Sequence, residues 1–354
     1  MELQGQCLLA PMTTLGLGGP AEYFRDIHSG VELEECLAHV QRRKMPLTLL
    51  GGGSNALIPD EGIAGLVVRY CARGIENIQE TADSVLLRVA AGESWDRLVE
   101  WSVMRGFWGL ECMSGIPGWV GAAPIQNIGA YGTELSGVLE SVSLFDIETS
   151  SYLEVTADTL ELGYRMSRFK RDWKGRFVVL DITIRLSKIP KPNISYKDLE
   201  SLRRQNEIPE LQAIRDKVLE VRAKKSMLAD PHDPDAQSVG SFFVNPVVTR
   251  EQLTVLERVC TKQGLGDVPK HSVGEMNWKV PAAWLIERAG FLKGTRFGQV
   301  GISSKHSLAL VHYGQGSLNE LLRLANNIRD ACFREFGIQL EREPQILVPF
   351  QCTQ

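Results

Sequence analysis

The sequence predicts a mixed α+β protein with two or three domains. The chain has 354 residues, 44% of them hydrophobic, so it can bury more than one core. In the first half, segments with apolar residues at helical spacing alternate with short apolar runs. Residues 178–186 then alternate apolar and more polar side chains, and the mixed pattern starts again after the proline- and lysine-rich residues 188–193. We therefore expect a domain boundary in the segment that begins at residue 188.

The first expected elements are a helix and three strands. Apolar residues at helical spacing predict a helix within residues 31–44. The run Leu-Thr-Leu-Leu at 47–50 leads directly into glycine, which is typical of a strand followed by a turn. Residues 65–70 and 85–90 have the composition of two further strands.

A second helix and a long strand complete the first half. Ser94 is expected to cap a helix that ends at Gly106. The period of two in residues 178–186 predicts a strand with one buried face.

The second half begins with a strongly charged helix that carries an apolar stripe and ends near residue 225. A short strand near Val239, a helix from Thr249, a proline-started helix at 281–289 and a strand at 308–311 are expected next.

A long helix and a strand are expected at the end of the chain. Ser317 and Glu320 predict a capping box at the start of the helix, which should stop before Gly337. The tail at 338–350 has the composition of a strand.

Composition excludes several classes of function. The net charge of −4, with acidic and basic residues well mixed, gives no basic field for nucleic acid. The sequence has no run of about 18 apolar residues and no signal-peptide pattern, so we expect a cytoplasmic protein without membrane insertion. Seven scattered cysteines and six dispersed histidines indicate reduced thiols and no metal site.

Residues 112–133 form an uncharged segment that is rich in glycine, alanine and proline. Its glycines and prolines would break a membrane helix or a core helix. Glycine lets main-chain N–H groups approach a ligand closely, so the segment predicts a wall around a large, partly flat cofactor. A buried, tightly turned connection explains it equally well.

The motif Gly-Gly-Gly-Ser-Asn at 51–55 follows a predicted strand. Such a turn offers several N–H groups and polar side chains to a diphosphate. It is neither a dinucleotide-binding fingerprint nor a P-loop, and a simple tight turn is the alternative.

Three further motifs contain candidate chemical groups. Residues 163–170 hold three cations, one of which could bind a carboxylate, although a solvated basic turn is the simpler interpretation. Ser241 lies between glycine and two phenylalanines and could donate a proton in a cleft, or be a packed strand end. Glu341 and Glu343 lie two apart in the expected tail strand, so they should share a face and could divide acid and base work. Exposed strand faces carry such pairs too.

In order along the chain, these motifs resemble those of one family, the UDP-N-acetylenolpyruvoylglucosamine reductases, which are flavoenzymes of peptidoglycan precursor synthesis. The resemblance covers nearly the whole chain. Its segments are GGGSN at 51–55, AGESW at 91–95, GLE at 109–111, IPGWVGAAPIQNIGAYG at 116–132, GYRMSRFK at 163–170, SYKDL at 195–199, RAKK at 222–225, GSFFVNP at 240–246, AAWLIERAG at 282–290 and LERE at 340–343.

The resemblance implies a two-lobed FAD-binding region of the vanillyl-alcohol-oxidase type and a smaller α+β substrate-binding domain. The implied parts are a first FAD lobe at 1–75 joined by the tail 338–354, a second lobe at 76–188, a connecting loop and helix at 189–225, and the substrate domain at 226–337. The implied cofactor is noncovalent FAD, with Cys112 the cysteine to check near the second glycine loop.

The implied reaction has two halves. NADPH reduces FAD, and UDP-N-acetylglucosamine enolpyruvate then receives a hydride on its methylene carbon. By resemblance, Arg165 and Glu343 would stabilise the enol intermediate, and Ser241 would protonate the alpha carbon. A monomer is expected.

The resemblance also implies two sets of binding residues. The cofactor-binding set is Gly51, Gly52, Gly53, Ser54, Asn55, Ile116, Pro117, Gly118, Ala122, Gln126, Asn127, Gly129, Ala130 and Tyr131. The substrate-binding set is Tyr164, Tyr196, Lys225, Asn245 and Arg296, and Tyr196 makes the chain similar to the first of two family subtypes.

The chain departs from the family pattern in two places. Ala122 and Ala123 follow Gly121 where relatives often have a serine, so one hydroxyl contact to FAD is expected to be missing. Pro344 and Gln345 follow Glu343 where an apolar residue and an arginine are common. A related FAD oxidase of another small substrate, or a sugar-nucleotide binding protein without catalysis, are the competing hypotheses.

Overall fold

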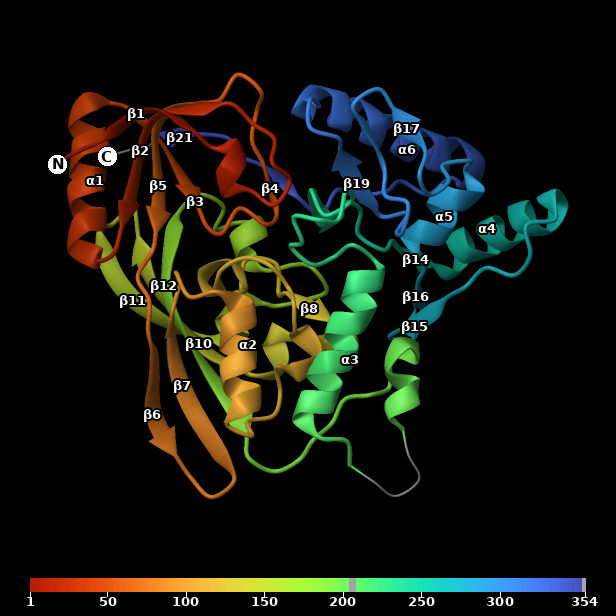
Figure 1. The fold of residues 1–354 in the computed structure, drawn as a ribbon, viewed down its shortest axis with the longest axis horizontal. Helices are drawn as coiled ribbons and strands as arrows, with labels where there is room; N and C mark the ends of the chain where they lie inside the picture. The colour runs from red at the N-terminus through yellow and green to blue at the C-terminus, as the bar shows by residue number, and fades with distance from the viewer. Residues whose placement is uncertain (204–207, 352–354) are drawn as a thin grey trace.

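The computed structural model describes residues 1–203 and 208–351, and it has three main sheets (Figure 1). Parts of two expected ranges, residues 204–207 of the connecting segment and 352–354 of the tail, lie outside the described residues. The expected mixed α+β class is confirmed, because helices and sheets alternate along the chain.

The first sheet has the order β1-β2-β5-β3-β21 and contains both ends of the described chain. Parallel pairing joins β5 to β2 and to β3, whereas β1 and β21 pair antiparallel at the two edges. Helix α1 packs its apolar stripe on this sheet, as the spacing in residues 31–44 predicts. The bounds are β1 Gln4–Leu8, β2 Pro20–Ile27, α1 Gly30–Arg43, β3 Pro46–Leu50, β5 Ile63–Tyr70 and β21 Phe350–Gln351.

The second sheet is antiparallel throughout, with the order β11-β10-β12-β7-β6. Helices α2 and α3 pack side by side next to it and share its core, which is the largest in the molecule (Figure 1). The bounds are β6 Ile75–Glu80, β7 Ser84–Ala90, α2 Trp95–Met104, β10 Leu139–Asp146, β11 Ser151–Thr156, β12 Phe177–Ser187 and α3 Leu211–Lys224.

The third sheet, with the order β13-β19-β18-β17, packs against α5 and α6 in the C-terminal part of the chain. A small sheet, β14-β16-β15, lies next to α4. The bounds are β13 Ser238–Ser241, β14 Val247–Thr249, α4 Arg250–Gln263, β15 His271–Val273, β16 Asn277–Lys279, α5 Ala282–Arg288, β17 Arg296–Phe297, β18 Val300–Ile302, β19 Ala309–His312 and α6 Leu318–Phe336.

Short elements complete the chain. Two small strand pairs are β4 Ala56–Leu57 with β20 Gln345–Ile346, and β8 Gly129–Ala130 with β9 Thr133–Glu134. The 3-10 helices are η1 Ala10–Met12, η2 Glu111–Met113, η3 Val120–Ala122, η4 Leu135–Gly137, η5 Ala157–Leu160, η6 Arg168–Lys170 and η7 Lys197–Leu202.

The long strand β12 does not have the single buried face that its alternation predicts. A register shift against β10 leaves Leu180 as an extra residue, which is a β-bulge. Val178 before the bulge and Leu180 at the bulge pack in the core between α1 and the first sheet, whereas Ile182 and Ile184 pack in the core of the second sheet. One strand therefore joins two cores, which the period of two alone could not indicate.

Two predicted caps differ from the structure. Ser94 lies at the N-cap position of α2, but its side chain accepts no capping hydrogen bond. At α6, the Ser317 hydroxyl accepts from the Glu320 amide as predicted, but the Glu320 carboxylate accepts from the backbone N–H of Gln299 and does not complete the box.

The tail is not one strand. It contributes an isolated bridge between Arg342 and Phe243, then β20, then β21. Because it crosses from the third sheet to the first, it passes close to the segment after β3.

Candidate active site

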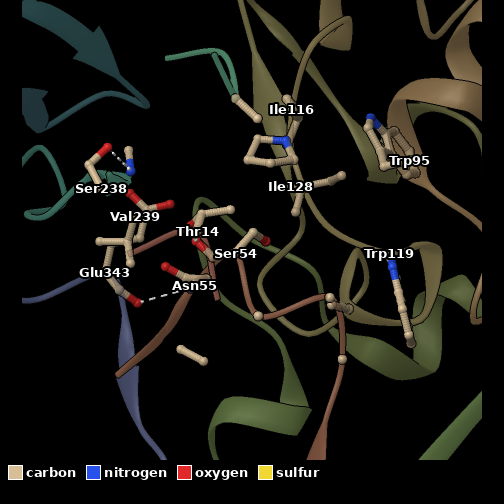
Figure 2. A pocket seen from close by; sticks show the side chains of 18 of the residues that line it. Thr14, Ser54, Asn55, Trp95, Ile116, Trp119, Ile128, Ser238, Val239 and Glu343 are labelled. Atoms are coloured by element: carbon tan, nitrogen blue, oxygen red, sulfur yellow. Dashed lines mark hydrogen bonds between the residues drawn. The ribbon is translucent and has the colours of Figure 1, made fainter. Parts of the chain in front are cut away.

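A cavity of about 600 Å³ lies between segments that are far apart in the sequence (Figure 2). Its volume is within the usual size range of ligand sites. Its walls are the loop after β3, the uncharged segment 112–133, the segment from Arg222 to Ser241 and the tail near Glu343. In Figure 2, Glu343, Ser238 and Val239 lie on one side, and Trp95 and Trp119 on the other.

The loop at 51–55 forms one wall of the cavity. It turns sharply because Gly53 has φ 66°, and a side chain there would meet the Met12 carbonyl oxygen at 2.0 Å. Asn55 donates from Nδ2 to the Gln126 side chain at 2.9 Å and so ties the loop to the uncharged segment.

The uncharged segment forms the adjoining wall through residues that include Ile116, Pro117, Ala122, Gln126 and Gly129. Gly118, Asn127, Ala130 and Tyr131 do not line the cavity directly. Gly118 packs against Ser54, since a Cβ there would lie 2.4 Å from the Ser54 hydroxyl oxygen.

Asn127 supports this wall from behind. Its side chain is fully buried, donates to the Gly163 carbonyl at 3.1 Å and accepts from the Ser136 amide at 2.9 Å. Asn127 therefore connects the uncharged segment to the turn that carries Arg165.

The walls suit a large aromatic cofactor with a diphosphate. The segment 112–133 contains no charged residue, so the part of the cavity wall that it forms is neutral. The two glycine loops touch with no space for a Cβ at Gly52, and both loops line the cavity. The residues present therefore fit FAD.

Arg165 and Glu343 form an ion pair inside the cavity. Arg165 Nε lies 3.0 Å from Glu343 Oε1, and their side chains are 19% and 14% exposed. Gln126 donates from Nε2 to the same oxygen at 3.2 Å, and Arg165 Nη2 donates to the Gly129 carbonyl at 2.7 Å. Burial raises the pKa of Glu343 above its usual value, while Arg165 and Lys170 oppose that rise.

Ser241 lies at the end of β13 and lines the same cavity. The next residue, Phe242, accepts a backbone hydrogen bond from Glu343 at 3.0 Å, which brings the serine and glutamate segments together. The three residues expected to be catalytic therefore share one cavity.

Glu341 has a different position from Glu343. Glu341 is exposed and does not line the cavity, although its charge acts on Lys170. The two-residue spacing allowed both glutamates to share acid and base work, but only Glu343 lines the cavity and pairs with Arg165.

The expected substrate residues lie outside the cavity wall, in separate groups. Tyr196 packs edge-on against Tyr131 with 5.4 Å between ring centres, and Lys225 pairs with Asp198 at 2.6 Å. Lys225 also lies 5.9 Å from the Tyr131 ring.

Tyr164, Asn245 and Arg296 are placed elsewhere. Burial raises the pKa of the Tyr164 hydroxyl, and the neighbouring Asn245 opposes that rise. The Asn245 side chain accepts from the Ala282 amide at 2.8 Å, at the start of α5. Arg296 stacks 3.8 Å from the centre of the Tyr313 ring.

The cavity also has residues that sequence reasoning did not single out. They include Thr14, Trp119, Lys170, Arg222, Gln237, Ser238 and the segment 226–231. Lys170 could have been found as one of three cations in residues 163–170, but the segment 226–231 has no comparable signal in the sequence.

Comparison with known proteins decides the family. Residues 23–148 match an FAD-binding domain, and residues 231–347 match the C-terminal domain of UDP-N-acetylenolpyruvoylglucosamine reductases. The reductase of Thermobifida fusca is 41% identical over 96% of each chain. The chain belongs to the UDP-N-acetylenolpyruvoylglucosamine reductase family. The reductase of Saccharopolyspora erythraea is 39% identical over 97% of this chain and 95% of that one.

A solved structure supports the same fold. The reductase of Thermus caldophilus superposes with a TM-score of 0.66 at 24% identity, covering 98% of this chain and 99% of that one. The chain is thus an FAD-dependent oxidoreductase whose FAD-binding domain precedes the reductase C-terminal domain, as the motifs indicate. Among the described residues, no helix is long and apolar enough to span a membrane, and no cluster of metal-ligating side chains occurs.

Proposed function

We propose that this protein uses NADPH to convert UDP-N-acetylglucosamine enolpyruvate into UDP-N-acetylmuramate. The main support is the meeting of Arg165, Glu343 and Ser241 in one cavity, between two neutral glycine-rich loops. FAD, when bound there, supplies the hydride that the enolpyruvyl methylene carbon receives.

The three side chains provide what the substrate needs as its double bond is reduced. Negative charge develops on the alpha carbon and its carboxylate, and the Arg165 guanidinium stabilises charge there. Glu343 holds Arg165 in place through the 3.0 Å contact. Ser241 donates the proton that the alpha carbon takes up, which completes the addition of hydride and proton across the double bond.

Residues 51–55, with Ile116, Pro117, Ala122, Gln126 and Gly129, hold the cofactor in this proposal. We propose that binding is noncovalent, because Cys112 lies behind the wall with its thiol donating to the Asn193 carbonyl at 3.1 Å. Burial raises the pKa of Cys112 to about 12, so the thiol is a poor nucleophile.

We further propose that Tyr164, Tyr196, Lys225, Asn245 and Arg296 bind the sugar nucleotide outside the FAD cavity, at the positions described above. The parts 1–75 with 338–354, 76–188, 189–225 and 226–337 are the proposed domains. A cytoplasmic monomer is part of the proposal.

The role of Ser241 is tested by separating the half-reactions under anaerobic conditions. The variant Ser241→Ala should be reduced by NADPH at nearly the wild-type rate, because that step needs no proton from the serine. Its reoxidation by the enolpyruvyl sugar nucleotide should be slower by roughly 10²–10⁴-fold, as expected for loss of a proton donor. Equal slowing of both half-reactions would show that the serine has another role.

A further inference from the structure

Lys170 lines the cavity beside Arg165 and Glu343 but has no part in the proposed chemistry so far. We propose that Lys170 is a positioning residue for the second half-reaction, whose ammonium group fixes the backbone of Arg165 and adds a second positive charge near the Glu343 carboxylate. This inference rests on the proposed function.

The backbone of Arg165 needs support. Gly163 and Met166 exchange backbone hydrogen bonds at 3.0 and 3.1 Å, which closes a tight turn over Tyr164 and Arg165. Arg165 has φ 55°, in the left-handed region that costs free energy for a residue other than glycine. The conformation persists only if other contacts hold it.

Lys170 supplies one of these contacts. Its Nζ donates to the Arg165 carbonyl at 3.0 Å, at the opposite end of the residue from the bond between Nη2 and Gly129. Lys170 itself is fixed by η6, because the Ser167 hydroxyl caps this helix and donates to the Ile125 carbonyl at 2.5 Å. The turn, the helix and the uncharged segment thus form one connected unit.

The charge balance explains why a cation is needed at this position. Arg165 and Glu343 alone would be neutral as a pair, and the substrate adds a carboxylate that becomes more negative during reduction. With Lys170 the cluster carries a net positive charge, so it can accept that anion. The other carboxylate that acts on Lys170 is Glu341, which is exposed and therefore screened by solvent.

The positive charge of Lys170 also favours the ionised form of Glu343. Burial raises the pKa of Glu343, and Lys170 is one of two cations that oppose the rise, beside the Gln126 amide. Burial lowers the pKa of Lys170, which Glu343 and Glu341 oppose. Removing the lysine charge should therefore let Glu343 protonate at higher pH.

The test compares Lys170→Met, Lys170→Arg and the matched control Lys174→Met, which removes an exposed lysine from the same segment. Each holoenzyme is reduced with NADPH and then mixed anaerobically with the enolpyruvyl sugar nucleotide. For Lys170→Met, we expect FAD content and flavin reduction within about twofold of wild type, and reoxidation slower by roughly 100-fold. Lys170→Arg should recover at least tenfold of that loss, and Lys174→Met should match wild type.

The pH profile supplies a readout that packing alone would not change. In Lys170→Met, the acidic limb of the reoxidation rate should move to higher pH, in line with easier protonation of Glu343. If Lys170→Met fails to retain FAD, Lys170→Gln takes its place, since glutamine can still donate to the Arg165 carbonyl but has no charge.

Two outcomes would overturn the inference. One is reoxidation of Lys170→Met or Lys170→Gln at the wild-type rate, and the other is no recovery with Lys170→Arg together with an unchanged pH profile. Failure of the wild-type enzyme to be reoxidised would refute the proposed function itself, so the two failures are distinguishable.

Discussion

The contact between the two glycine-rich loops depends on the absence of a side chain at Gly52. A Cβ there would lie 2.9 Å from Gly118 Cα and 3.0 Å from the backbone nitrogen of Trp119. Both are backbone atoms and cannot move aside cheaply. At Gly51, in contrast, the nearest atom would be Ala122 Cβ at 3.6 Å, an ordinary van der Waals distance.

This difference predicts opposite outcomes for two adjacent alanine substitutions in the FAD-free protein. Gly52→Ala should lower the free energy of unfolding by about 1–3 kcal/mol, because it forces the loops apart. Gly51→Ala should change it by less than about 0.5 kcal/mol. Urea unfolding followed by tryptophan fluorescence measures both, and equal effects of the two substitutions would argue against loop contact at Gly52.

The sequence could predict which residues belong to the site, but it could predict less well how these residues are arranged. The glycine loops, Ser241 and Glu343 could be recognised from motifs, and they do share one cavity. Arg165 was indicated only by the resemblance, because the residue pattern alone could not rank the three cations of 163–170, and it is the turn at Gly163–Met166 that brings Arg165 to Glu343. Arg168 instead pairs with Asp172.

Among the helices, α2 and α3 are joined by an ion pair that also supports the second glycine loop. Arg215 on α3 is only 7% exposed and donates to both oxygens of Asp96 on α2, at 2.7 and 3.0 Å. The same carboxylate accepts from the Gly115 amide at 2.6 Å. Asp96 therefore connects two helices to the start of the cavity wall.

The pKa of Asp96 gives this pair a defined pH dependence. Burial disfavours the charged carboxylate, but Arg215 and the Gly115 amide outweigh burial and lower the pKa of Asp96 below its usual value. Because the pKa of Asp96 is lower in the folded protein than in the unfolded chain, the ionised carboxylate stabilises the folded state at pH values above the unfolded-state pKa, which is near 4. This stabilisation is lost as the pH falls through the folded-state pKa.

Asp96→Asn should therefore lower the free energy of unfolding by about 2 kcal/mol at pH 7. The difference from wild type should shrink below about pH 4, where the carboxylate takes up a proton in the unfolded state, and should be smallest below the lowered pKa of the folded protein, where both states are protonated. Urea unfolding at both pH values provides the measurement, with Asp267→Asn at an exposed position as the control. A deficit that stays constant down to pH 2 would rule out the charged pair as its cause.

Helices could be predicted more closely than strands. Spacing located α1, α4, α5 and α6 within a residue or two, because each has a continuous apolar stripe or clear end signals. The single face of β12 and the continuous tail strand were wrong, since a bulge and a crossing between sheets depend on distant partners. Strands β1, β2 and β10 were not anticipated.

At the scale of the molecule, the tail joins the first and third sheets and places Glu343 between them. Glu343 donates to Phe242 beside β13, while Gln345 donates to the Asn55 carbonyl after β3. Glu343, the end of β13 and the loop at 51–55 are thus held together by a few residues of backbone. The N-terminus and the last described strand, β21, both lie at the first sheet, on the side of the molecule away from the third sheet (Figure 1).

We propose above that this protein reduces an enolpyruvyl sugar nucleotide in this cavity with electrons from NADPH. The most direct test of this proposal is the visible absorbance of bound flavin in the wild-type protein under anaerobic conditions. We expect bleaching by NADPH and full recovery on adding UDP-N-acetylglucosamine enolpyruvate, with no recovery on adding UDP-N-acetylglucosamine. A flavin that stays bleached with the enolpyruvyl substrate, or a purified protein without flavin, would contradict it.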